Sequence, residues 1–351
     1  MQIDFHHGVT YVTARLAGFS HVEATTVAGA SQYVDDAVNS GTISFDNGAM
    51  YARISSAHKM LDYRNFEALA DHLVWLPFHF LPGNGGLRAG LHPEGSFVQK
   101  LVCLPNSPVA QDLIRSVIGE RHRRYALHRL GVTMHTYADT WAHQGFVGVP
   151  HVVNHATHLT GPGGEPDHSL KDRLENFFIN KALPLGHGAV LSNPDKPYHV
   201  WGYTNGHGQR VERNNPRDFL DAADHMCRVM QCFRAGDADL KAPGLLEGDR
   251  AAIWSLLNGL RQEDAAERHA AWLAEIRRGA FSFGPDDVTY TGEGDGSWKH
   301  EALGAHDPKA EEHNYRDEFL ASDWKLFHDA LQAHRFDVML HILPEYGICA
   351  A

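Results

Sequence analysis

Apolar residues recur along most of the chain at intervals of three and four positions, which is the spacing of an amphipathic helix. This spacing predicts helices over 9–18, 21–39, 108–145, 168–182, 216–234, 247–279 and 313–343, with one or two more within 49–73. Ser20 and Glu23 form the capping-box pattern that begins the second helix, and Gly18 ends the first. Alternating patterns typical of strands are few, so the sequence predicts a mainly α fold.

Stretches rich in glycine and proline separate these helices. They cover 81–107, 146–167, 183–216 and 280–312, and the last of them has room for a short hairpin. No repeat, low-complexity segment or linker marks a domain boundary. We therefore expect a single large helical domain with long loops and a C-terminal helical extension that packs on the rest.

Histidine is the residue type that stands out in the composition. The 351 residues include 26 histidines, against 31 lysines and arginines together. Neutral imidazole is the commonest metal ligand and the usual acid–base group near neutral pH. The formal net charge of -12 argues against duplex nucleic acid as a partner, because proteins that bind it are normally basic. A small phosphate ester held by metal ions remains compatible with this charge.

The first residues, MQIDFHHG, lack the basic and apolar regions of a secretory signal. No apolar run reaches the roughly 18 residues that a membrane span needs. None of the 4 cysteines forms a C-x-x-C pair, so the sequence offers no thiolate zinc site. We expect a cytoplasmic protein without a membrane span.

The clearest sign of chemistry is the segment LGVTMHTYADTWAH, residues 130–143. His135, Asp139 and His143 are spaced i, i+4, i+8 and therefore stack along one face of a helix. An imidazole and a carboxylate one turn apart can bind one cation, and the third side chain can reach the same ion or a second one. The alternative is a row of hydrogen-bonded side chains, although an apolar helix rarely buries such groups without partners or a metal.

Further candidate ligands lie before and after this helix. His79 stands between two phenylalanines ahead of a glycine-rich loop, either as a core histidine or as a ligand. Asp35 or Asp36, at the end of the second predicted helix, could bridge two cations. Glycines flank His187, so the backbone there can approach another group closely. The remaining candidates, for each of which a surface position is the ordinary alternative, are His6, His7, His58, His168 and Asp172.

The segment LGVTMHTYAD resembles the LG-x-x-x-H-x-x-x-D helix of the zinc-dependent phospholipase C family and of the related single-strand-specific nucleases. His79 and Phe80 resemble the ligand segment that precedes this helix in the phospholipases. The family's order of ligands is matched by His6, Asp35, His79, His135, Asp139, His143 and His187. The opening residues and the stretch SQYVDD are also similar to a group of bacterial proteins. The resemblance therefore points to a divergent bacterial branch of this superfamily and covers roughly residues 1–235.

The resemblance implies a helical fold of the zinc phospholipase C type and hydrolysis of a phosphate ester, either a phosphodiester or a phospholipid-like molecule, by a metal-bound water. Two or three zinc ions are expected, and imidazole with carboxylate also suits manganese or iron. Residues 1–246 would form the metal-binding domain, and 247–351 a helical extension that caps the site or forms a homodimer. The candidate catalytic carboxylates are Asp35, Asp36 and Asp139.

The sequence departs from the resembled family in three respects. His143 follows Asp139 by four residues, which is closer than in the phospholipases. The secreted members bind one zinc through an N-terminal tryptophan, which this chain lacks, and Asp4 or His7 could take its place. The family's final pair of ligands is matched either by His168 with Asp172 or by His187. These departures concern the third metal ion and the substrate.

Other functions remain open on the same ligands. An iron-dependent oxidase or oxygenase can use histidines and carboxylates on helices, and a non-catalytic helical module can use a metal for stability alone. An HD-type phosphohydrolase fits less well, because the ligand helix has no adjacent His-Asp pair. Four aromatic residues could line a substrate groove, although such rings are more often part of a core: Phe78, Phe80, Trp141 and Phe146.

Overall fold

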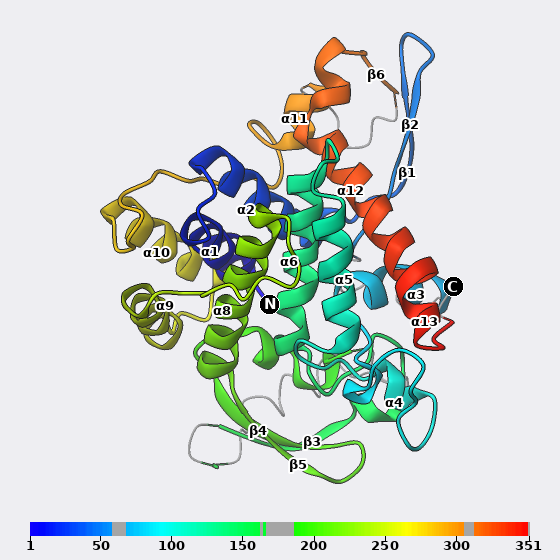
Figure 1. The fold of residues 1–351 in the computed structure, drawn as a ribbon, viewed down its shortest axis with the longest axis vertical. Coiled ribbons are helices and arrows are strands. Elements are labelled where there is room, and N and C mark those ends of the chain that lie inside the picture. The colour runs from blue at the N-terminus through cyan, green and yellow to red at the C-terminus, as the bar shows by residue number, and fades with distance from the viewer. Residues whose placement is uncertain (58–67, 162–163, 166–185, 305–311, 350–351) are drawn as a thin grey trace.

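The computed structural model describes residues 1–57, 68–161, 164–165, 186–304 and 312–349 (Figure 1). Helices dominate this part of the chain, so the prediction of a mainly α fold is confirmed. The α-helices are α1 (Thr10–Leu16), α2 (His21–Asp36), α3 (Ala68–Phe78), α4 (Val98–Leu101), α5 (Pro108–Gly119), α6 (Ala126–Ala142), α8 (Asn215–Ala235), α9 (Glu247–Gly259), α10 (Ala265–Arg278), α11 (Trp298–Leu303), α12 (Asp323–Asp337) and α13 (Leu343–Glu345). Shorter helical segments are the π-helices η1 (Asp4–Val9) and η8 (Val338–Ile342) and the 3-10 turns η3 (Asn84–Gly86), η4 (Val152–Asn154), η5 (Gly188–Val190), η6 (Asn193–Asp195) and η7 (Asp317–Ala321). The predicted helix over 168–182 lies outside the described residues.

Short strands form two small sheets at opposite ends of the described molecule (Figure 1). The strands are β1 (Gly41–Phe45), β2 (Met50–Arg53), β3 (Ala156–Thr160), β4 (Val200–Asn205), β5 (Arg210–Asn214) and β6 (Glu312–His313). In the first sheet β1 pairs antiparallel with β2 and parallel with β6, and the second sheet is antiparallel in the order β3-β4-β5. The prediction of helix within 49–73 is therefore wrong for β2, which pairs with β1 across a tight turn.

Several predicted helix boundaries move in the structure. The capping box at Ser20 and Glu23 is confirmed, whereas α2 ends three residues earlier than predicted, at Asp36. The segment 247–279 is two helices rather than one, because Asp264 accepts a hydrogen bond from the second residue of α10 and begins a new helix. The described part of 280–312 contains α11 rather than a hairpin.

The central helix of the fold is α6. Every residue of this helix from His128 to its end is buried, and α2, α8 and α12 pack around it (Figure 1). Gly131 allows α2 to approach closely, since a Cβ atom there would lie 2.4 Å from the Val27 carbonyl oxygen and 2.6 Å from the Ala30 Cβ. This contact brings the last turn of α2 beside the polar face of α6.

The N-terminal and C-terminal regions share one hydrophobic core. Trp272 and Ile276 of α10 belong to the same buried cluster as Phe5 and Val9 of η1. Gly8 permits this packing, because a Cβ atom at its position would lie 3.2 Å from the Cβ of Trp272. The first turns of the chain are thus held between α6 on one side and α10 on the other.

Candidate metal centre

The polar side chains that the sequence predicts along α6 lie together inside the protein. His135, Asp139 and His143 are exposed by only 0%, 1% and 4%. The Oδ2 atom of Asp139 lies 3.4 Å from Nε2 of His135 and 3.6 Å from Nδ1 of His143. One helix therefore supplies a buried carboxylate with an imidazole one turn away on each side.

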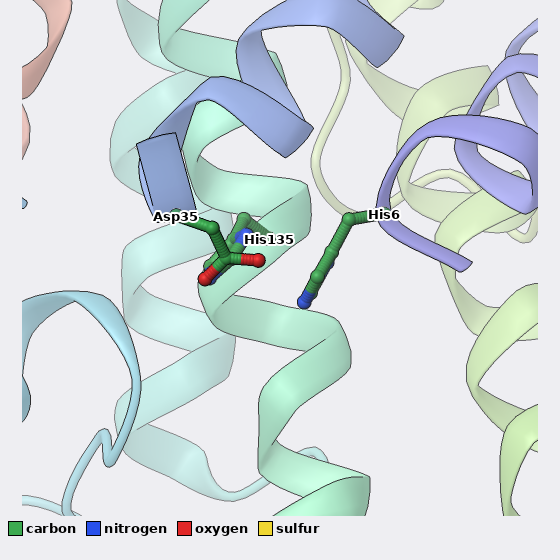
Figure 2. Close-up of side chains that lie close together, drawn as sticks. All are labelled: His6, Asp35 and His135. Carbon is green, nitrogen blue, oxygen red and sulfur yellow. The ribbon is translucent and has the colours of Figure 1, made fainter. Parts of the chain in front are cut away.

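Three other elements add side chains to this face. The Asp139 carboxylate lies 3.2 Å from His6 Nε2, through Oδ1, and 3.3 Å from His79 Nδ1, through Oδ2. Asp35, in the last turn of α2, places Oδ1 3.8 Å from His135 Nε2. Figure 2 shows Asp35 and His6 reaching toward His135 from two different helices, and the rings of His6 and His135 stack with centroids 3.8 Å apart.

Among the described residues, three groups could each hold a metal ion, because their ligand atoms lie within 4.8 Å of one another. The groups are His6 with Asp35 and His135, His79 with His135 and Asp139, and His143 with His187 and Asp195. All seven ligands of the resembled family's order are thus brought together in space. Metal binding by them remains a prediction.

The third group contains a carboxylate that the sequence analysis missed. Asp195 lies in η6, with Oδ1 3.3 Å from His143 Nε2 and Oδ2 3.4 Å from His187 Nε2. The sequence signal that could have found it is the segment NPDKPY, which directly follows the loop of His187.

Backbone carbonyls fix the orientation of four imidazoles. One ring nitrogen of each donates to a carbonyl oxygen: His135 to Ser31 at 2.8 Å, His79 to Ser56 at 2.8 Å, His143 to His79 at 2.7 Å and His187 to Leu191 at 2.7 Å. The other nitrogen of each ring then faces the carboxylates with its lone pair when the imidazole is neutral. This is the arrangement by which proteins orient metal-ligating histidines.

His6 has a different environment. Its side chain is fully buried, and neither ring nitrogen has a hydrogen-bond partner among the described residues. Burial, together with the nearby His135, lowers the pKa of His6 to about 3, so the ring is neutral near pH 7. A buried polar atom without a partner is costly, and a cation bound at Nε2 would remove this cost.

The amine of Met1 lies between the two buried carboxylates. Its nitrogen is 2.5 Å from Asp139 Oδ1 and 3.3 Å from Asp195 Oδ1. Burial opposes the charge on this amine, but Asp139 and Asp195 outweigh it and raise its pKa to about 11. Asp4 and His7, which the sequence suggested for this part of the site, belong to none of the three groups.

The charges of the site favour a bound cation. Burial alone would raise the pKa of Asp139, but His143, the Met1 amine and the other imidazoles hold it well below its ordinary value. Burial disfavours a charged His79, yet its contacts with Asp139 and Asp35 raise its pKa. The ionised carboxylates thus attract positive charge, which protons and the amine supply when no metal ion is bound.

Several predicted residues lie elsewhere. Asp36 accepts a hydrogen bond from the Tyr290 hydroxyl at 2.5 Å and belongs to none of the three groups, which does not support it as a catalytic carboxylate. His7 contacts His269, with 2.9 Å between ring nitrogens. The aromatic residues offered as groove lining are all buried: Phe78, Phe80, Trp141 and Phe146. Phe80 nevertheless lies at the site, where its ring stacks on that of His143 with centroids 4.4 Å apart. His58, His168 and Asp172 lie outside the described residues.

The donor atoms of the three groups are imidazole nitrogens and carboxylate oxygens. Such a set fits zinc, manganese or iron, and no cysteine belongs to it. The described helices include none that is both long and apolar enough to span a membrane.

Comparison with known proteins places the chain in one family. No curated protein and no solved structure matches it. A family model matches residues 1–342, and therefore includes the candidate metal centre together with α9, α10 and α12. The chain belongs to a family of unknown function (DUF6765).

Proposed function

We propose that the chain is a metal-dependent hydrolase that cleaves phosphate esters with zinc ions bound by the three His/Asp groups. The observation that carries this proposal is the position of Asp139. Its carboxylate lies 3.2 Å from His6, 3.3 Å from His79 and 3.6 Å from His143, and each of these histidines belongs to a different group. Cations held by the three groups would be close neighbours around one carboxylate.

Neighbouring divalent cations lower the pKa of a water molecule and hold the attacking and leaving oxygens of an in-line displacement. The protein's own residues orient the metal ligands and neutralise the charge of the metal ions. The carbonyl-fixed imidazoles of His79, His135, His143 and His187 present lone pairs, and the ionised Asp139 and Asp195 offset the charge of the ions. The burial of these groups limits the access of water to them.

Asp35 is the ligand best placed to meet the substrate. Its side chain is 34% exposed, whereas those of Asp139 and His135 are almost fully buried. Its Oδ1 atom faces both His135 and His79, at 3.8 and 4.0 Å. In our proposal the ester enters past Asp35, whose carboxylate accepts the proton that the attacking water loses.

The resemblance of the α6 segment to the ligand helix of the zinc-dependent phospholipases supports both the metal and the substrate class. It favours a phosphodiester or a phospholipid-like ester over other substrates. The homodimer expected through residues 247–351 and the cytoplasmic location remain predictions.

Metal analysis combined with phosphodiesterase assays tests the proposal. We expect the purified protein to contain zinc and to hydrolyse bis(p-nitrophenyl) phosphate or p-nitrophenyl phosphorylcholine. A chelator should abolish turnover, and zinc should restore it. Protein that contains iron and hydrolyses neither ester, even after loading with zinc, would instead favour the oxidase alternative and reject the hydrolase.

A further inference from the structure

The N-terminal segment is tied to α10 by a buried ion pair. The Nε atom of Arg268 donates to Oδ2 of Asp4 at 2.6 Å, and the two side chains are exposed by only 0% and 1%. Asp4 is the first residue of η1, the π-helix that carries His6. The pair therefore joins the C-terminal region to the segment that supplies one ligand of the candidate metal centre.

The guanidinium of Arg268 donates several further hydrogen bonds. Beyond Asp4, it donates to the side-chain oxygen of Gln2 and to the backbone carbonyls of Gln262 and Glu263, the last at 3.1 Å. The planar arginine fork fixes direction as well as distance, which a lysine ammonium does not. Arg268 thus defines where residues 2 and 4 lie relative to the first turn of α10.

Two neighbouring residues of α10 continue this contact. His269 Nε2 lies 2.9 Å from Nδ1 of His7, and the Trp272 side chain covers Gly8. His6 points the other way, toward Asp139, and it makes no hydrogen bond among the described residues that could hold its ring in place. The position of the His6 imidazole therefore depends on its backbone, which α10 holds, and on the stacking of its ring against His135.

We infer that α10 positions the N-terminal metal ligand, with Arg268 as the positioning residue that acts through Asp4. The inference rests on the proposed metal binding and adds a role for the C-terminal region. Arg268 touches neither ligand nor substrate, and its effect belongs to the group of His6, Asp35 and His135. The group of His143, His187 and Asp195 contains none of these residues. Because the Met1 amine lies beside Asp195 and Glu263 pairs with Lys196, we expect the affinity of this group to change less, rather than not at all.

Replacing both partners of the buried ion pair gives a variant that removes the anchor without leaving an unpaired charge. Removing one partner leaves an uncompensated charge and strongly destabilises a protein, whereas replacing both by apolar residues of similar size is often close to neutral. The double variant Asp4→Leu with Arg268→Met should therefore fold while η1 loses its anchor. Arg129→Met with Asp337→Leu is the control, because it removes a second ion pair, with 3.0 Å between Nη2 and Oδ2 and side chains exposed by 1% and 17%.

Metal affinity, measured by Co2+ absorbance titration and by Zn2+ competition with a chromophoric chelator, is the readout. We expect the dissociation constant of one class of site to be about 10–100-fold larger in the Asp4/Arg268 variant. Losing residues that hold metal ligands in place typically weakens metal binding by this factor. The group of His143, His187 and Asp195 should change less than this class of site, and all sites of the control variant should stay within about twofold. Dissociation constants of the Asp4/Arg268 variant that all match the wild type would overturn the inference.

Two further outcomes keep the test decisive. If the double variant fails to fold, Arg268→Lys retains the charge but loses the contacts of the fork, and it should weaken the same class of site; unchanged affinity would again reject the positioning role. A wild-type protein that binds metal and shows the expected shift, but hydrolyses no ester, supports the inference and rejects only the hydrolase. Wild-type protein that binds no metal ion rejects both.

Discussion

At the scale of single residues, the hydrogen bonds from imidazole nitrogens to backbone carbonyls determine which ring nitrogen is free to bind a metal ion. His135 and His79 each donate one N–H to a carbonyl, so the other nitrogen faces Asp139 with a lone pair when the ring is neutral. A lone pair beside an ionised carboxylate is repulsive unless a proton or a metal ion lies between them. Protons and metal ions therefore compete for the same positions in this site.

The substitution Asp139→Asn tests this arrangement directly. It keeps the size of the side chain but removes the charge around which His6, His79 and His135 gather. We expect metal affinity to fall by more than the 10–100-fold that losing an outer-shell contact costs. Ester hydrolysis should fall with it. Metal content after dialysis and kcat at saturating zinc measure the two effects.

Asp249→Asn is the control for this substitution. Asp249 is also buried, and it accepts hydrogen bonds from Ser282 far from the three groups. The control should retain metal and activity even where its unfolding free energy falls. Equal loss of metal in both variants would show that the Asp139 variant fails through general unfolding rather than through loss of a ligand.

The limits of sequence reasoning are also visible at this scale. The spacing along α6 was sufficient to find His135, Asp139 and His143, because helical geometry alone brings them together. That spacing says nothing of His6, which the family resemblance favoured over His7; in the structure the π-helical turn of η1 directs His6 toward Asp139. Asp195 was missed because its partners come from other segments.

At the scale of elements, the site depends on how closely α2 approaches α6. Asp35 is on α2 and His135 on α6, and Gly131 lies at their contact, where a Cβ atom would be 2.4 Å from the Val27 carbonyl oxygen. Backbone cannot move aside as a flexible side chain can. A methyl group at position 131 must therefore separate the two helices.

The substitution Gly131→Ala should lower both stability and metal affinity. Overpacking of this kind typically costs about 1–3 kcal/mol of unfolding free energy. The separated helices should also weaken binding by His6, Asp35 and His135. Urea unfolding and metal titration measure the two effects. Gly119→Ala is the control, because a Cβ atom there meets nothing within 4 Å and alanine is the better helix former. Gly131→Ala protein as stable as the wild type would contradict the close packing.

Element boundaries were predictable where local chemistry sets them. The capping box of Ser20 and Glu23 is such a case, and its prediction is confirmed. The strand β2 was not predictable, because its four residues have no strong alternation and become a strand only by pairing with β1. The division of 247–279 into α9 and α10 follows from Asp264, whose capping role the apolar pattern concealed.

At the scale of the whole molecule, the core buries several histidines whose rings are kept neutral by their removal from water. Burial is the main cause that lowers the pKa of these rings, to about 3 for His6, His7, His328 and His334 and about 4 for His269. The contacts of His79 act in the opposite direction and raise its pKa. Several buried histidines in different parts of the fold thus contribute to the pH dependence of stability. Substituting one histidine at a time can measure the contribution of each.

His334 offers the cleanest separation, because it lies outside the three metal groups and donates from Nε2 to the Pro77 carbonyl at 2.9 Å. Its pKa is near 6.5 in the unfolded chain and about 3 when folded, so below pH 6.5 the unfolded chain binds a proton that the folded chain does not. Each pH unit of acidification in this range then costs up to about 1.4 kcal/mol through this one ring, and nothing is lost above pH 6.5.

The variant His334→Gln keeps a donor for Pro77 but cannot take up that proton. Its unfolding free energy relative to the wild type should therefore be constant between pH 7 and 8 and improve by about 2 kcal/mol on going to pH 5. Urea unfolding of the metal-free proteins at each pH measures this difference, and His328→Gln, at a second buried ring, should give a shift of the same sign. Because other titrating groups contribute equally to both proteins, they cancel in the comparison. A difference that stays the same from pH 8 to pH 5 would mean that His334 binds its proton as readily when folded as when unfolded, and the ring would then not be held neutral by burial.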